Sequence, residues 1–418
     1  MTIEASSLTT RVVSRRWLLA AVPVAAVAIA GCSSTSSSSG SSSSTASAAS
    51  TASADGAAAA GSVAALAQTF YKTLDDDQKL TVLLDYTLAN AKRWSNLPQG
   101  LLGGSAGGGA PSGSQSGGPS GGGTPPGGGT PPSGSGSQSG GMGGGGNQAR
   151  LGISIGDLND EQLAACTALL KAATGTATGL GYSEIELQLA ADDYLADQGG
   201  GDDYGRKNFY VALLGSPQDS GTWEFQFGGH HLAVANTYTD GKLAGATPSF
   251  RGIEPNAEFD LDGKTYQAPL KVKEAAFAAL LASLSADQQT TAKLADTYSD
   301  LVLGPGQDWA FPTDKEGVQA STLSAQQKKL AFAAIATYVN DIADGDAKTI
   351  LAKYSDELDD TYIAFSGTTA LTEQNDYIRV DGPSVWIEFS MQRGIVLSGN
   401  HPHSVWRDRT TDYGGTKS

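Results

Sequence analysis

The chain has 418 residues, with 27 basic side chains, 43 acidic side chains and a formal net charge of −16 at pH 7. Residues 1–31 hold three arginines and one glutamate, so 24 basic and 42 acidic side chains remain without them. Because a surface this acidic repels phosphate groups, we exclude nucleic acid and anionic lipid surfaces as partners.

The N-terminus has the pattern of an export signal, which we assign to residues 1–31. Arg15 and Arg16 belong to a basic segment, and residues 17–31 are apolar but shorter than the roughly 20 residues that span a membrane. Small residues before Cys32 resemble a bacterial lipobox, so we expect a lipid on Cys32 and anchoring at the extracytoplasmic face of the membrane. An ordinary signal peptide is the alternative, and the paired arginines leave Sec and twin-arginine export both open.

Two low-complexity tracts flank and interrupt the rest of the chain. Residues 32–61 are rich in Ser, Ala and Gly, and residues 99–148 are rich in Gly, Ser and Pro, so neither tract can form a hydrophobic core. We predict a disordered tether over 32–61 and a disordered insertion over 99–148. The insertion interrupts a first α+β half, residues 62–256, and residues 257–418 form a second half.

One sequence pattern occurs four times: a Leu, then Asp, Asn or Ser, then a Gln three positions after that polar residue. The four polar residues are Asp75, Asn159, Ser285 and Ser324. This is the pattern of a capping box, in which the polar side chain accepts from a helix amide and the Gln reaches back. We therefore predict four helix starts, and a calcium site at Asp75–Asp77 is the less favoured alternative.

The spacing of these helix starts predicts an internal duplication. Ser285 and Ser324 lie 39 positions apart, and Asp75 and Asn159 lie at a similar spacing once the Gly/Ser/Pro tract is removed. Each half continues into a similar stretch, 208–215 and 360–367. Because helices precede strands, we predict an α+β fold with two related halves, packed as one pseudo-symmetric unit. The predicted strands are residues 222–227, 231–239, 242–250, 377–380, 385–391 and 404–407.

All four histidines fall in two short clusters, His230 with His231 and His401 with His403. Residues i and i+2 of an extended segment share a face, so His401 and His403 can meet one ion. A bulge or a close backbone approach at Gly228–Gly229 could turn the first pair toward one point. Since neutral imidazole binds divalent transition metals, we predict that the four histidines bind zinc or copper. We also expect His231 and His403 to lie within roughly 8 Å of each other, which allows a shared ion.

Two other functions stay open, a metal-dependent hydrolase and a structural or adhesive surface module. The ligand in either case would be a small molecule or a component of the cell envelope. A metal-dependent hydrolase would need a general base, for which Glu254 and Glu388 are the candidates. Arg379, Arg407 and Asp408 could support such a site. The alternatives are that Glu388 occupies the polar face of a strand and that Arg407 with Asp408 forms a surface ion pair. The third function is a structural or adhesive surface module, in which the histidines only donate hydrogen bonds.

Several long segments carry the histidines and their surroundings. They are Trp223–Ala233, Ala246–Pro255, Val385–Phe389, Asn400–Asp408 and Asp412–Gly414. These segments resemble the bacterial family called domain of unknown function 3500, and the resemblance extends over about 62–98 and 149–418. The resemblance implies an exported globular domain marked by histidines, and it implies no reaction.

Overall fold

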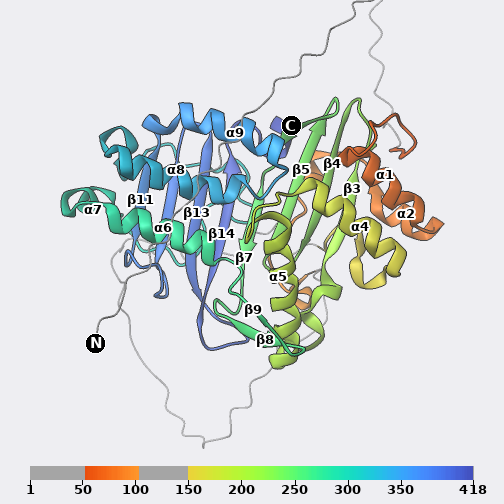
Figure 1. Cartoon of the computed structure of the whole chain (residues 1–418), viewed down its shortest axis with the longest axis horizontal. Helices are drawn as coiled ribbons and strands as arrows, with labels where there is room; N and C mark the ends of the chain where they lie inside the picture. The colour runs from red at the N-terminus through yellow and green to blue at the C-terminus, as the bar shows by residue number, and fades with distance from the viewer. Residues whose placement is uncertain (1–51, 103–148, 418) are drawn as a thin grey trace, which may run out of the picture. The chain divides into compact units, whose positions relative to one another are not determined.

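The computed structural model describes residues 52–102 and 149–417. Its main element is a mostly antiparallel sheet, which has 12 strands in the described part of the chain (Figure 1). Ten of them follow the order β1-β3-β4-β5-β7-β14-β13-β12-β11-β10, β2 pairs with β3, and β6 pairs with β5. The strands are β1 (Leu83–Leu84), β2 (Ile153–Ser154), β3 (Tyr210–Leu214), β4 (Thr222–Gly229), β5 (Leu232–Thr239), β6 (Lys242–Gly245), β7 (Ser249–Gly252), β10 (Val318–Gln319), β11 (Tyr362–Ser366), β12 (Tyr377–Asp381), β13 (Val385–Arg393) and β14 (Asn400–Asp408). A separate hairpin consists of β8 (Phe259–Leu261) and β9 (Lys264–Tyr266).

Most helices of each half precede its long strands, and only the short strands β1, β2 and β10 lie among them. The predicted α+β class is therefore confirmed. The α-helices of the described ranges are α1 (Val63–Thr73), α2 (Asp76–Val82), α3 (Leu88–Ala91), α4 (Asp160–Ala173), α5 (Gly181–Leu195), α6 (Lys271–Ser283), α7 (Ala286–Ala292), α8 (Ala325–Val339) and α9 (Asp344–Asp356). None of these helices is long and apolar enough to cross a membrane.

The four predicted helix starts are confirmed as capping boxes, at α2, α4, α7 and α8. At α4, Asn159 Oδ1 accepts from the Gln162 amide at 3.0 Å, and Gln162 Oε1 accepts from the Asn159 amide at 3.0 Å. Each box satisfies donors that a helix N-terminus otherwise leaves without partners. At α2 the side chain of Asp75 accepts from the Gln78 amide as part of the capping box. This structural role accounts for Asp75, so the acidic residues 75–77 need no calcium ion to explain them.

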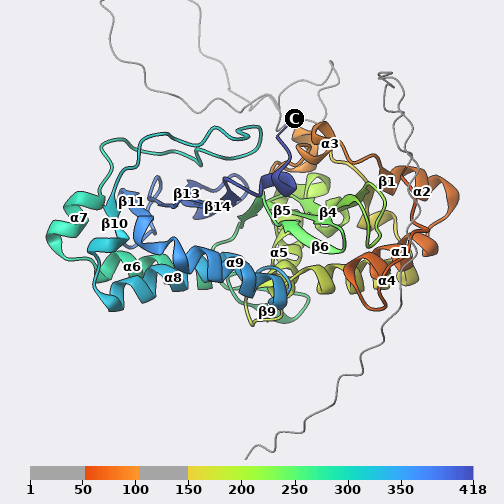
Figure 2. The ribbon, with the colours of Figure 1, turned by 90° about the horizontal axis from the view of Figure 1, so that it is seen from above.

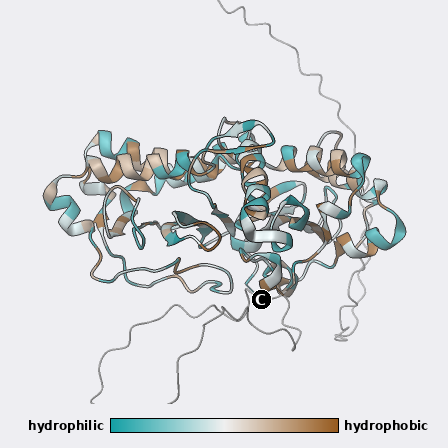
Figure 3. Ribbon diagram, turned by 90° about the horizontal axis from the view of Figure 1, so that it is seen from below, coloured by the Kyte–Doolittle hydropathy of each residue, from teal (hydrophilic) through white to brown (hydrophobic). Residues whose placement is uncertain are grey.

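One face of the sheet packs against helices. Helices α6, α8 and α9 lie on the same side of the second half, as Figure 2 shows from above. Phe277 of α6, Ile335 of α8 and Phe389 of β13 are fully buried in the same apolar cluster. Each large apolar side chain buried in this way contributes about 1.5–3 kcal/mol. Hydrophobic and hydrophilic residues alternate along these helices (Figure 3).

The opposite face of the second half is covered by a long loop, residues 294–317 (Figure 2). Glu388 of β13 anchors this loop, since its carboxylate accepts from the amides of Val302 at 2.6 Å and Leu303 at 2.9 Å. A buried carboxylate is stabilised by such charge-assisted hydrogen bonds. The loop therefore delivers its side chains, Asp300 among them, to the face of the sheet that lacks helices.

The two halves meet where β7 lies between β5 and β14 (Figure 1). Within β7, Arg251 pairs with Leu232 of β5, and Gly252 pairs with His403 of β14. Both ladders are antiparallel, so the sheet continues from one half into the other. This pairing brings the turn between β4 and β5, residues 230–231, next to the start of β14, residues 400–403.

A buried ionic cluster also joins the halves. Lys273 of α6 donates to Glu184 of α5 at 2.5 Å and lies 3.0 Å from Asp341, and Arg251 contacts Glu184 at 3.1 Å. The four side chains are at most 2 % exposed. Removing one partner of such a cluster leaves an uncompensated buried charge, which is strongly destabilising.

Residues 52–61 differ from the predicted tether, because they pack against the folded part. Ala54 is buried, the Ser53 amide donates to Ser216 Oγ at 2.7 Å, and the Ala59 amide donates to Asp219 Oδ2 at 2.7 Å. These contacts are made by backbone groups, which composition does not reveal. Similarly, 99–101 form a short 3₁₀ helix. The predicted signal, Cys32 and the rest of both low-complexity tracts lie outside the described residues.

Candidate metal centre

His230 and His231 form the two-residue turn between β4 and β5, in which Gly229 pairs with Leu232. The strand ladder is regular at both glycines, so the predicted bulge is wrong and the predicted close backbone approach is correct. A Cβ at Gly229 would lie 2.5 Å from the ring of Phe209, which only glycine avoids. His231 has a φ of +60°, a conformation that turns favour but that is uncommon for a residue with a side chain.

His401 and His403 lie at the beginning of β14, between β13 and β7. As predicted from their spacing, their side chains share one face of the strand, and their Nε2 atoms are 3.3 Å apart. The shared face is the one that the helices do not cover, since His403 pairs with Ser390, two positions from the loop anchor Glu388.

The two clusters meet, although the chain separates them widely. His403 Nε2 lies 3.1 Å from His231 Nε2, which confirms the prediction that these side chains are close. The rings of His231, His401 and His403 have centroids 5.0 Å apart in every pair. One nitrogen from each ring lies within 4.8 Å of the other two, so the three histidines could hold a metal ion.

Burial keeps two of these imidazoles neutral. His231 and His401 are 5 % and 2 % exposed. Burial, followed by the other histidines, lowers the pKa of His401 to about 2 and the pKa of His231 well below its ordinary value. A neutral imidazole is the form that binds a metal, so both rings have a free lone pair throughout the physiological pH range.

Asp300 in the loop orients the third imidazole. Its carboxylate accepts from Nδ1 of His403 at 3.1 Å. With its proton on Nδ1, a neutral His403 carries the lone pair on Nε2, the atom that faces His231 and His401. Carboxylate–histidine pairs of this kind commonly support metal ligands. No motif around Asp300 marked it in the sequence.

His230 does not belong to the converging group. Its Nδ1 donates to Asp192 of α5 at 2.6 Å, both side chains are at most 4 % exposed, and its ring stacks on that of His231 at 3.7 Å between centroids. The two neighbouring rings therefore have different polar partners, Asp192 for His230 and His403 for His231. The ring of His230 packs against one face of the His231 ring. Asp192 was also missed from the sequence, although Glu184, Gln188 and Asp192 follow one another at intervals of four and mark a polar stripe on α5.

The two candidate general bases are engaged elsewhere. Glu254 accepts from the amide of Leu397 at 2.6 Å in the loop between β13 and β14. Glu388 accepts from Tyr377 and Trp386 at 2.7 and 2.8 Å, in addition to the two loop amides. Burial raises the pKa of Glu388 in spite of these hydrogen bonds. In the described residues, neither carboxylate is hydrogen-bonded to a histidine.

The supporting residues predicted from the sequence contact other parts of the fold and not the histidines. Arg379 pairs with Glu316, and Arg407 contacts Asp412 at 2.8 Å. Asp408 accepts from the hydroxyl of Tyr354 at 2.7 Å. Other described partners of these three residues include Asp308 and Lys353. Arg407 and Asp408 are both buried, so the surface ion pair considered for them is wrong.

The model of one family, described as protein of unknown function (DUF3500), matches residues 146–415, which include all four histidines, Asp192 and Asp300. No curated protein and no solved structure matches the chain.

Proposed function

The chain belongs to the DUF3500 family, and we propose that it binds one divalent transition-metal ion through Nε2 of His231, His401 and His403. The observation that carries this proposal is the spacing of the three nitrogens. Tetrahedral coordination with metal–nitrogen bonds of 2.0–2.1 Å separates ligand atoms by about 3.3 Å. The two Nε2 separations at His403, 3.1 and 3.3 Å, fit this value.

The chemistry of the ligands favours zinc or copper. Three neutral imidazoles and no thiolate suit zinc, copper, nickel or iron, and copper binds such sites most tightly among the divalent ions of the first row. Asp300 would orient His403 by accepting from its Nδ1, and Asp192 would fix the ring of His230 against His231. These two acids supply the outer contacts that metal-binding histidines generally have.

Metal titration of the purified, metal-depleted protein tests the proposal. Wild-type protein should bind one equivalent of Zn²⁺ or Cu²⁺ at neutral pH, and the double variant His401→Ala/His403→Ala should bind none. The variant His230→Asn removes a histidine but keeps all three ligands, so it should still bind one equivalent, with a lower affinity because the ring of His230 packs against that of His231. A wild-type protein that takes up neither ion, or a double variant that binds as well as wild type, would refute the site.

A metal-dependent hydrolase is the second candidate, since three protein ligands leave a fourth position for water or substrate. A metal ion in such a site lowers the pKa of the water that it binds. Glu254 and Glu388 hold backbone segments in place and are poorly situated to act as bases. Visible spectra of the Co²⁺-substituted protein decide between the candidates. A spectrum that changes with pH and with added anions supports an open position, and an unchanging spectrum supports a closed binding site.

The position of Cys32 supports a cell-surface location for this site. Lipidation at Cys32 would place the described residues outside the membrane, joined to it through the Ser/Ala tract. The membrane contact would then be the lipid alone. Mass spectrometry of the membrane fraction tests this, since a diacylglyceryl-modified Cys32 should be the first residue of the mature protein.

An internal duplication is supported by matching contacts in the two halves. Gln162 Nε2 donates to Gln78 Oε1 at 2.7 Å and to the carbonyl of Thr73 at 3.0 Å. In the same way, Gln327 Nε2 donates to Gln288 Oε1 at 2.7 Å and to the carbonyl of Ser283 at 2.8 Å. The short strands that lie between the two capping boxes of each half, β2 and β10, pair antiparallel with β3 and β11. A site built from both halves is consistent with this origin.

A further inference from the structure

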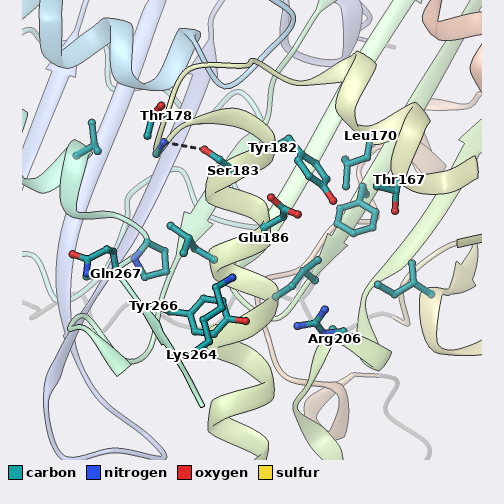
Figure 4. A pocket seen from close by; sticks show the side chains of 18 of the residues that line it. Thr167, Leu170, Thr178, Tyr182, Ser183, Glu186, Arg206, Lys264, Tyr266 and Gln267 are labelled. Carbon is teal, nitrogen blue, oxygen red and sulfur yellow. Dashed lines mark hydrogen bonds between the residues drawn. The ribbon is translucent and has the colours of Figure 1, made fainter. Parts of the chain in front are cut away.

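A second site of a different kind lies on the helix-covered side of the first half. It is a cavity of about 700 Å³ between α4, α5, β4 and the β8–β9 hairpin (Figure 4). This volume is in the range of small-molecule sites. The wall is mainly apolar and includes Leu170 of α4, Leu189 of α5 and Phe227 of β4.

Helix α5 separates this cavity from the metal centre. Residues Glu184, Gln188 and Asp192, spaced by four, face β7 and His230, because they contact Arg251, the carbonyl of Gly252 and His230 in turn. The cavity is lined by the other side of the helix, including Tyr182, Glu186 and Leu189. Positions four apart share a helix face, so the two sets point in different directions. Ligand binding in the cavity therefore needs none of the histidines.

The rim of the cavity exposes large apolar side chains. Leu163 is 37 % exposed and Val272 is 41 % exposed, and both line the cavity. They are two of the five large hydrophobic residues exposed within the described ranges. Exposed apolar groups at the mouth of an apolar cavity mark a site for an apolar ligand, since covering them removes that surface from water.

The charges on the wall select the polar end of the ligand. The wall carries three cations, Arg206, Lys264 and Lys271, and one acid, Glu186, in a protein whose net charge is −16. Lys271 is paired with Glu274 at 2.5 Å. Arg206 is held by Asp193 through Nε, which leaves its terminal amino groups without a partner among the described residues.

Lys264 is the most available of these cations. Its Nζ lies 4.3 Å from the ring centroid of Tyr266, and it forms no ion pair among the described residues, whereas Lys271 and Arg206 each have a carboxylate partner. In the view of Figure 4, Lys264 and Arg206 lie toward one end of the cavity, and Thr178 and Ser183 lie toward the other. An anionic group at the first end would meet two cations, while an apolar chain would fill the rest.

We propose that this cavity binds a long-chain carboxylate, with the chain against Leu170, Phe227 and Val272 and the carboxylate at Lys264 and Arg206. The proposal goes beyond metal binding and does not depend on it. It gives the protein a ligand of defined chemistry: an unbranched apolar chain with a single negative charge at one end.

Isothermal titration calorimetry with dodecanoate, below its micellar concentration, tests this proposal on the exported chain. Wild-type protein should bind one equivalent of dodecanoate, and should bind dodecylammonium and acetate at least tenfold more weakly. Lys264→Glu should raise the dissociation constant about five- to tenfold, because Lys264 is exposed and its replacement affects the headgroup contact rather than folding. Lys242→Glu, the same charge change on the exposed strand β6, should bind as wild type does.

Three outcomes would overturn the proposal: no heat with dodecanoate, equal binding of dodecylammonium, or an equal loss of affinity in Lys242→Glu. The double variant His401→Ala/His403→Ala should still bind dodecanoate with wild-type affinity. This result would hold even if the protein bound no metal, so failure of the metal centre and failure of the cavity are distinguishable. Val272→Asp provides an independent check, since a carboxylate at the rim should weaken binding at least fivefold.

Discussion

Nε2 of His231 and Nε2 of His403 lie 3.1 Å apart, although 172 positions separate the two residues in the chain. Two imidazole nitrogens this close require either a shared proton or a shared metal ion. His401 Nε2 approaches the same nitrogen of His403 at 3.3 Å. With its proton on Nδ1, His403 has one lone pair on Nε2, which can accept a proton from only one of the two neighbouring rings. A cation bound by all three lone pairs therefore explains the arrangement more completely.

Replacing Asp300 should weaken metal binding without abolishing it. Asp300→Asn keeps the size of the side chain but removes the charge that holds Nδ1–H of His403. Loss of such an outer contact commonly lowers metal affinity 10- to 100-fold. Competition with a chromophoric chelator at neutral pH measures the change. Asp296→Asn, an exposed acid of the same loop, is the control and should leave the affinity unchanged.

Metal removal should lower the melting temperature. An ion present at about 100 times its dissociation constant stabilises the folded protein by about 2.7 kcal/mol, provided that the unfolded chain does not bind it. Scanning calorimetry should therefore show a clear fall when a chelator is added to the wild-type protein and none for His401→Ala/His403→Ala. If the histidines are purely structural, the chelator has no effect, and each His→Asn change costs only about 1–3 kcal/mol as a lost buried hydrogen bond.

The glutamines of the capping boxes should matter more than their exposed neighbours. Gln327→Ala removes a cap, the bond to Gln288 and the bond to the carbonyl of Ser283. We expect the free energy of unfolding to fall by about 1–3 kcal/mol, the usual cost of leaving buried polar groups without partners. Gln326→Ala, one residue earlier and exposed, should change it by less than about 0.5 kcal/mol. Urea denaturation of both variants makes the comparison.

Glu224 should make folding stability depend on pH. It is fully buried between Gln226 and Thr237, and burial raises its pKa from 4.5 to about 7. The folded protein thus holds this proton more tightly than the unfolded chain does. The resulting stability is fully present below pH 4.5 and is lost as the pH rises to about 7, by up to about 3 kcal/mol.

The variant Glu224→Gln isolates this contribution, because Gln has the same shape and does not titrate. The unfolding free energy of the wild type minus that of the variant should fall steadily from pH 4.5 to 7. The wild type thus loses stability relative to the variant as the pH rises. Denaturant titrations at four or five pH values measure it. A difference that is constant across this range would contradict a raised pKa at Glu224.

Local signals in the sequence predicted the parts of the fold that depend on local physics. The capping boxes follow from side-chain chemistry within four residues, and the common face of His401 and His403 follows from strand geometry. The turn at His230–His231 was not predicted, because two histidines carry none of the usual turn chemistry and the glycines before them pointed to a bulge. The glycine at position 229 is required by the ring of Phe209, which lies in a different segment of the chain and could not be inferred from the local pattern.

Partners from distant segments could not be predicted in the same way. Asp300 reaches His403 because Glu388 accepts from the backbone amides of Val302 and Leu303 and so holds the loop in place. Almost every residue has a backbone amide, so the sequence of the loop does not reveal this contact. The cavity needs α4, α5 and the β8–β9 hairpin to be placed together, and no periodicity encodes that placement. The packing of 52–61 likewise depends on backbone amides that donate to the side chains of Ser216 and Asp219.

The place of β14 in the sheet has a consequence for the order of folding. Among the described strands it comes last in the chain, yet it lies in the middle, between β7 of the first half and β13 of the second. Until β14 has been synthesised, β7 has no neighbour on that side and the halves cannot join into one sheet. Such long-range pairing forms slowly. Two of the three ligands of the proposed metal centre, His401 and His403, belong to β14. The proposed centre can therefore form only after β14 has been synthesised and has paired with β7, so metal binding would follow the last pairing step of the sheet.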